Sequence, residues 1–230
     1  MSLEVTETVD TLILERRSTR AFLPQQVERE LIDDILTVAS HAPSGANAQP
    51  WMVHVLSGNA LERVTKSVLS VFDDPEQKKS QREEFDYYPS EWIEPFKARR
   101  RQNGLDLYGL LGIGREDKPE MLAHQRRNYE FFGAPVGLIF TIDRIMGLGS
   151  LMDYGMFLQN IMIAAQARGL NTCPMAAFNI FHTVVRHELS LPDSEQILCG
   201  MALGYGDPTA TVNQLTNSRA GLSEFVFHHD

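Results

Sequence analysis

Five consecutive residues near the N-terminus form the densest set of groups in the chain that could bind an anion. Residues 16–20 read Arg16-Arg17-Ser18-Thr19-Arg20, with three guanidinium groups and two hydroxyls. Arginine forks match phosphate oxygens with paired hydrogen bonds, and hydroxyls and turn N–H groups add further donors. The same pattern also fits a solvated basic turn at a helix C-terminus, where cations are favoured. The segment is therefore a candidate phosphate site, with capping of a helix as the alternative.

Two further segments combine a constrained backbone with small or amide-bearing side chains. Residues 42–51 form a rigid loop with prolines, a glycine and amides that can bond to a planar heterocycle or a polyol chain. Residues 169–178 hold small residues that let a flat ligand approach the backbone. Ordinary loop chemistry explains either segment taken alone. The candidate residues are Pro43, Ser44, Asn47 and Gln49 in the first segment, and Met175, Ala176 and Ala177 in the second.

The other reactive residues form no metal, redox or nucleophile pattern. Cys173 and Cys199 lie in apolar stretches without the spacing of a redox pair, so reduced and mostly buried thiols are expected. A catalytic cysteine stays open as an alternative. His182 and His187 do not share a helix face, which argues against a metal site. We therefore predict no metal site, and the sequence has no Walker, serine-elbow or zinc-protease motif.

Composition favours a small-molecule partner. The chain has 230 residues, with 43% hydrophobic and 22% charged residues, which suits a single domain with a buried core. The formal net charge of −9 argues against nucleic acid and anionic membranes as partners. Residues 1–15 lack the basic region of a secretory signal, and no apolar stretch is long enough to span a membrane. A cytoplasmic enzyme is the expectation.

Hydrophobic periodicity predicts the elements that must position these segments. Helices are expected over residues 5–16, 28–40, 59–71, 120–132, 148–168 and 181–189, and strands over 51–56, 135–142 and 196–205. Strands do not alternate strictly with helices, so an α+β sheet packed by helices is favoured over a doubly wound parallel sheet.

Three regions need an explanation beyond a simple core. Residues 72–119 are charged and aromatic, and read as an insertion that either covers a pocket or is a solvated excursion. The helix over 148–168 is apolar on most sides, so it should be central or lie at a dimer interface. The tail over 207–230 is extended and polar with an apolar end, and a tail of this kind needs a surface to pack on.

Taken in order, the segments resemble the nitroreductase family of FMN flavoproteins, in particular its longer nitroaromatic-reductase members. Residues 16–22, 42–51 and 169–178 look like the three FMN-binding segments of that family. Residues 203–208 and the pair Ser218-Arg219 resemble its last strand and its C-terminal phosphate contact. The resemblance implies one domain over residues 1–230 with an insertion at about 72–119. Its fold would be a central, mostly antiparallel sheet of about four to five strands, with an extended C-terminal arm exchanged between the subunits of a homodimer.

The resemblance also implies a role for each candidate residue. Arg16 and Ser18, joined by Arg219, should hold the phosphate or ribityl end of FMN, and Arg20 should approach the flavin pyrimidine. Where relatives often carry a second base beside the C-terminal arginine, this chain has Asn217. Arg17 and Gln49 are further implied cofactor contacts. Pro43, Ser44 and Asn47 should reach the FMN of the partner subunit. The backbone of Met175, Ala176 and Ala177 should lie near flavin N5. Some relatives have a glutamate at the position of Ala176, so only a backbone contact is expected there.

The implied activity is an NAD(P)H oxidoreductase with ping-pong kinetics. NADH or NADPH would deliver a hydride to the flavin, and a flat, electron-poor acceptor such as a nitroaromatic or quinone would then occupy the same space and take the electrons. The sequence does not choose between the two nucleotides, because no dinucleotide-binding fingerprint is used. Two alternatives stay open: the same fold with reductive dehalogenation or flavin cleavage as its chemistry, and a flavin-binding protein without catalysis.

Overall fold

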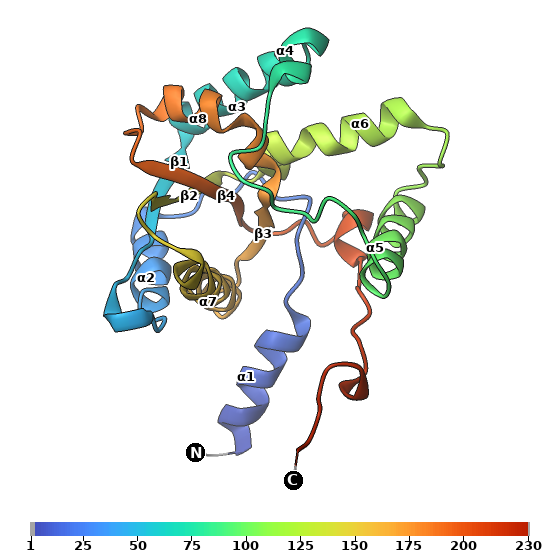
Figure 1. Cartoon of the computed structure of the whole chain (residues 1–230). Coiled ribbons are helices and arrows are strands. Elements are labelled where there is room, and N and C mark those ends of the chain that lie inside the picture. Colours follow the sequence, from blue (N-terminus) through green and yellow to red (C-terminus); the bar gives the residue numbers. More distant parts are fainter. Residues whose placement is uncertain (1–2, 230) are drawn as a thin grey trace.

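The computed structural model describes residues 3–229, in which an antiparallel sheet lies between two groups of helices (Figure 1). Residues 1, 2 and 230, which end the predicted terminal segments, lie outside the described range. The α-helices are α1 (Leu3–Glu15), α2 (Arg29–Ala39), α3 (Gly58–Phe72), α4 (Pro75–Ser80), α5 (Phe96–Leu110), α6 (Lys118–Arg126), α7 (Leu148–Gln166) and α8 (His182–Leu189). The strands are β1 (Met52–Ser57), β2 (Val136–Asp143), β3 (Asn171–Met175) and β4 (Glu195–Gly204). Short 3₁₀ turns are η1 (Gly45–Asn47), η2 (Arg127–Gly133), η3 (Ala176–Phe181), η4 (Thr211–Gln214) and η5 (Leu222–Glu224).

The sheet has the order β1-β2-β4-β3, and every neighbouring pair of strands is antiparallel. β2 and β4 form its centre, where Leu138 lies opposite Met201 and both side chains are fully buried. Burial on both faces explains why these two strands are nearly continuous apolar runs in the sequence. The predicted α+β fold with a mostly antiparallel sheet is confirmed.

Strand β3 is an element whose position the sequence analysis did not predict. Residues 171–175 contain Pro174, which opposes Met201 of β4. A proline is compatible with an edge strand, because it cannot donate to a second neighbour and none is needed there. β3 is such an edge, so tertiary pairing with β4 overrides the weak local signal.

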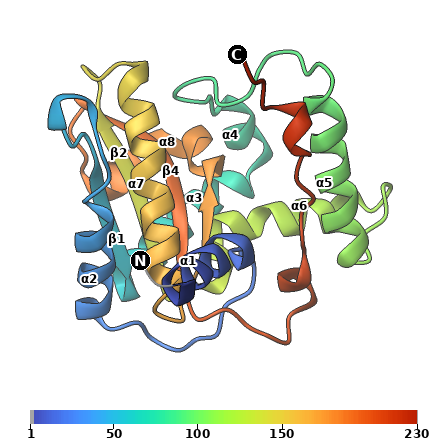
Figure 2. The same cartoon turned by 90° about the horizontal axis from the view of Figure 1, so that it is seen from below.

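Helices cover both faces of the sheet (Figures 1 and 2), and a hydrophobic cluster lies on each face. On one face α2 and α7 pack against β2 and β4, with Ile35, Phe157 and Ile161 fully or almost fully buried. On the other face α3, α8 and η2 supply a second cluster that includes Val68 and Val185. The sheet is therefore held as the middle layer, and the first and third candidate segments lie at its β3 edge.

The helix predicted over 120–132 is wrong in its second half. α6 ends at Arg126, and Phe131 and Phe132 have positive φ angles of 49° and 56°. Both rings are buried, and Phe131 stacks on Phe178 with ring centroids 4.8 Å apart. A Cβ at Gly137 would lie 2.6 Å from the Phe131 ring, so the missing side chain there makes room for it. Aromatic burial outweighs the backbone cost of the left-handed conformation.

Several apolar surfaces remain exposed in the single chain. α1 has no buried residue, and Figure 2 shows it lying beside α7. On α7 itself, Leu148 is 83% exposed and Met152 is 72% exposed, although the opposite side of the helix is buried. Within the described residues, no helix is long and apolar enough to cross a membrane.

The insertion contains α4, α5 and connecting loops, in line with the irregular helices and loops expected there. The C-terminal arm runs along α5, and Arg99 forms a 3.0 Å ion pair with Glu224. Near the end of the arm, Leu222, Phe225 and Phe227 are exposed. The arm thus touches its own chain's insertion, and its exchange between subunits stays a prediction.

Candidate functional site

A pocket of about 240 Å³ lies where the first candidate segment meets the C-terminal arm. We call it the arginine pocket; it is lined by Ile13, Leu14, Arg16, Arg17, Ser18, Arg20, Leu215, Thr216, Asn217 and Arg219. Four of these residues are arginines, although the net charge of the chain is −9. The fold therefore joins cations from both ends of the sequence into one anion-attracting cavity.

Backbone pairing holds the first segment against the β3 edge of the sheet. The Thr19 N–H donates to the Thr172 carbonyl at 3.0 Å, and the Leu23 N–H donates to the Tyr205 carbonyl at 2.8 Å. The Asn213 side chain then ties the arm to the segment. Its Oδ1 accepts from the backbone N–H of Arg20 at 2.8 Å, and its Nδ2 donates to the Asp207 carbonyl at 2.9 Å. Asn213 is a structural element of the pocket that sequence reasoning missed, because no local motif marks it.

Arg16 carries the clearest electrostatic signal of an anion-binding site. Its Nε atom is buried and has no hydrogen-bond partner. Burial lowers the pKa of the Arg16 guanidinium, and the positive charge of Arg219 lowers it further. An unpaired buried donor beside a like charge is unfavourable, and a bound phosphate would supply both the acceptor and the opposite charge.

The two cysteines are poor candidates for chemistry. Burial raises the pKa of the Cys173 thiol to about 11, although the positive charges of Arg20 and Arg16 act to lower it. Burial also raises the pKa of Cys199 to about 12. Thiolates are the reactive species, so both residues are inert near neutral pH, in line with the buried, reduced thiols expected. Among residues 3–229 no cluster of His, Cys, Asp and Glu could hold a metal ion.

The second candidate segment lies away from the arginine pocket. It precedes β1, which is the sheet edge opposite β3, so Pro43, Ser44, Asn47 and Gln49 line neither that pocket nor the larger one described below. Positive φ angles at Asn47 and Gln49 give the loop a tight shape, and Ser44 Oγ accepts from the Gln49 N–H at 3.0 Å. Asp153 of α7 fixes the loop through a 3.1 Å bond to the Gly45 N–H. The single chain therefore does not bring this segment together with the other two.

The third candidate segment follows the end of β3. Met175 is buried, and Ala176 and Ala177 begin η3 with partly exposed side chains. Met175, as the cap of this turn, makes no side-chain hydrogen bond to it. The first N–H groups of a helical turn have no partner within the turn, so they can donate to a ligand at this point.

A larger cavity of about 750 Å³ opens beside the third segment, between α7 and the sheet. We call it the large pocket; its lining residues are Phe85, Asp86, Tyr87, Ile142, Met146, Gly147, Leu148, Leu151, Tyr154, Gly155, Leu158, Pro174, Met175, Ala176, Gln196, Leu198 and Cys199. Most of these side chains are apolar, as is usual for a site that takes an aromatic molecule. The insertion supplies three of its residues, so the part of the insertion nearest the sheet does cover a pocket.

Comparisons with known proteins identify the family of the chain. The family model described as "Nitroreductase family" matches residues 13–205. A chloronitrobenzene nitroreductase of Comamonas testosteroni is 43% identical over 96% of this chain and 97% of its own length. A nitrobenzene nitroreductase of Ectopseudomonas oleovorans is 40% identical, again over 96% of this chain and 97% of its own.

Solved structures give the same result for the fold. The FMN and NADPH-dependent nitroreductase NfnB from sphigopyxis sp. strain HMH superposes with a TM-score of 0.93 at 36% identity, over 96% of this chain and 99% of that one. The FMN-dependent NfnB from Mycobacterium smegmatis, solved with NADPH, gives 0.92 at 30% identity, over 98% and 100%. The resemblance seen in the sequence is confirmed, and the chain belongs to the nitroreductase family.

Proposed function

We propose that this chain is an FMN-dependent NAD(P)H oxidoreductase that reduces nitroaromatic acceptors, and quinones of similar shape. The observation that carries the proposal is the arginine pocket, which gathers four guanidinium groups at the β3 edge of the sheet. The predicted enzyme class and cofactor agree with the names of the similar proteins, which are nitroreductases described as dependent on FMN and NADPH.

The residues present fit a flavin mononucleotide. The unpartnered Nε of Arg16 and the repulsion between Arg16 and Arg219 both call for a bound dianion such as the FMN phosphate. Arg16, Arg17, Ser18 and Arg219 would hold the phosphate end, and the guanidinium of Arg20 would stabilise negative charge on the pyrimidine. The backbone at Met175, Ala176 and Ala177 would hold the ring system. Bound there, the flavin supplies the hydride and electron transfer chemistry, so no side chain needs to act as acid or base.

The large pocket would receive the donor and the acceptor in turn. Its apolar walls suit a neutral aromatic ring, and closing over such a ring excludes water from the reacting face. NADPH is the donor we favour, because the two NfnB structures are described with it. NADH is the comparison in every assay.

A homodimer is part of the proposal. Exposed apolar residues on α1, α7 and the arm need a partner surface, and Leu148, Met152 and Phe227 are each more than two-thirds exposed. The loop around Pro43, Ser44 and Asn47 lies far from its own arginine pocket, which suits a role at the site of the partner subunit. We also place the enzyme in the cytoplasm. Sedimentation of a stable monomer with a full complement of FMN would argue against the dimer.

The decisive experiment uses the purified protein. It should be yellow, release a flavin with the mass of FMN, and lose its colour when NAD(P)H is added without air. Nitrobenzene should then restore the colour and be reduced. Colourless protein that FMN cannot reconstitute would refute the proposal. Bleaching without turnover of nitroarenes or quinones would point to dehalogenation or flavin cleavage, and bound FMN that NAD(P)H cannot bleach would point to a binding protein.

A further inference from the structure

Glu84, in the insertion, carries a buried carboxylate that the proposed chemistry does not use. Its side chain is only 3% exposed. One oxygen, Oε1, forms ion pairs with Arg144 and with Arg186, the latter at 3.0 Å. The other, Oε2, accepts the backbone N–H of Ile197 in β4 at 2.8 Å. A carboxylate buried this deeply is unfavourable unless it is fully partnered, so these contacts fix where the chain passes.

Asn179 fastens the same point of the chain from a second side. Its side chain is buried, and it lies in η3 two residues after Ala177. Its Oδ1 accepts the Glu84 N–H at 2.9 Å, and its Nδ2 donates to the Phe85 carbonyl at 2.7 Å. The Asn179 amide thus satisfies backbone N–H and carbonyl groups that a neighbouring strand could otherwise have paired with. Glu84 and Asn179 together hold the insertion against β4 and η3, and we call this pair the clamp.

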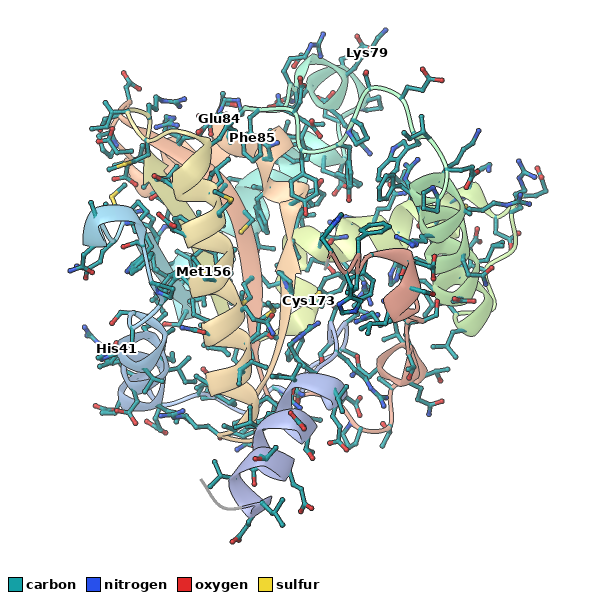
Figure 3. All side chains as sticks on the ribbon, turned by 60° about the horizontal axis from the view of Figure 1, so that its bottom comes forward. His41, Lys79, Glu84, Phe85, Met156 and Cys173 are labelled. Carbon is teal, nitrogen blue, oxygen red and sulfur yellow. The ribbon has the colours of Figure 1, made fainter. Side chains whose placement is uncertain are left out.

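The residues immediately after the clamp form a wall of the large pocket. Phe85 packs against the cluster between α7 and the sheet, and Asp86 and Tyr87 line the pocket with it. Figure 3 places Glu84 and Phe85 side by side at one end of the sheet, above α7. Burial raises the pKa of the Tyr87 hydroxyl, although about half of the residue is exposed. Glu84 directly precedes residues 85–87 in the chain, so the clamp fixes the position of this wall.

We propose that Glu84 and Asn179 are positioning residues for the acceptor: through the clamp they hold the wall 85–87 at the distance from η3 that an aromatic acceptor requires. The inference rests on the proposed function, because it assigns the large pocket to the acceptor. A wall displaced by about an ångström costs a bound reactant much of its productive geometry. Glu84 lines neither the arginine pocket nor the turn expected to contact the flavin, so the effect of changing it should fall on the acceptor and not on FMN binding.

The test compares Glu84→Gln with the matched control Glu83→Gln, whose side chain is exposed. The amide of Glu84→Gln can still accept from Ile197 but loses the charge that pairs with Arg144 and Arg186. We expect kcat/KM for nitrobenzene to fall by roughly ten- to a hundredfold. The FMN dissociation constant, and kcat/KM for ferricyanide, which needs no aromatic pocket, should stay within about twofold. Hydrogen exchange should accelerate in residues 85–95 alone.

A second variant keeps the inference testable if Glu84→Gln folds poorly. Arg144→Met removes one partner at the exposed side of the clamp and should give a smaller change of the same kind. An unchanged kcat/KM for nitrobenzene in every folded variant would overturn the inference. Parallel losses with nitrobenzene and ferricyanide would also overturn it, since they would indicate general destabilisation. Wild-type protein that binds no FMN would instead refute the proposed function, so the two failures are distinguishable.

Discussion

Replacing Arg16 by methionine should change two quantities in opposite directions. In the protein without FMN, the Arg16 guanidinium is partly buried beside Arg219 and its Nε has no partner. Burial and the positive charge of Arg219 disfavour the charged side chain, which is why its pKa is lowered. Methionine keeps most of the apolar stem and removes the charge, so the apoprotein of Arg16→Met should be more stable than wild type.

The same substitution should weaken FMN binding. A hydrogen bond to a charged group contributes about 1.5–3 kcal/mol, which corresponds to roughly a 10- to 150-fold rise in the dissociation constant. With FMN at a hundred times the wild-type dissociation constant, the ligand stabilises wild type by about 2.7 kcal/mol. A variant that binds a hundredfold more weakly would gain only about 0.4 kcal/mol under the same conditions.

Two measurements read these effects separately. Titration of apoprotein with FMN, followed by quenching of flavin fluorescence, gives the dissociation constant, and thermal unfolding with and without FMN gives the two stabilities. Arg63→Met, at an exposed position on α3, is the matched control and should change neither quantity. Unchanged FMN affinity, or an apoprotein that becomes less stable, would refute the assignment of Arg16 to the phosphate.

Three further predictions concern stability and acceptor choice. Burial, aided by two nearby arginines, lowers the pKa of His124 from 6.5 to about 4. The unfolded chain therefore binds a proton that the folded chain rejects, so the free energy of unfolding should fall as pH drops from 6.5 toward 4. Urea unfolding at several pH values should show a shallower fall in His124→Gln, and an identical slope would contradict the assignment. Gly200→Ala should cost about 1–3 kcal/mol in thermal unfolding, because its Cβ would lie 2.6 Å from the buried Phe178 ring; a neutral result would mean that the ring moves freely. Asp86 is the one charged residue among those that line the large pocket, so nitrobenzene should be preferred to 4-nitrobenzoate, and Asp86→Asn should lower the 4-nitrobenzoate KM by up to about fivefold. A preference for the carboxylate in wild type would exclude this pocket as the acceptor site.

The amino-acid sequence by itself determined the elements whose signal is local. Period-3.6 patterns locate α2 and α3 to within a residue or two, and continuous apolar runs locate β2 and β4, because periodicity and burial act over short stretches of chain. The segment at residues 16–20 is a phosphate candidate from residue chemistry alone. Even so, this pattern could equally cap a helix, and only the ordered set of segments favoured a flavin protein.

Tertiary structure decided what depends on partners far away in the sequence. Arg219 becomes part of the arginine pocket only because Asn213 ties the arm to the first segment. The helix predicted through residue 132 stops at Arg126 because the Phe131 ring is buried against Phe178. Strand β3, with its proline, exists through pairing with β4. In each case a long-range contact contributes more free energy than the local secondary-structure preference of the segment. A single sequence shows that local preference but does not show which distant residues come into contact.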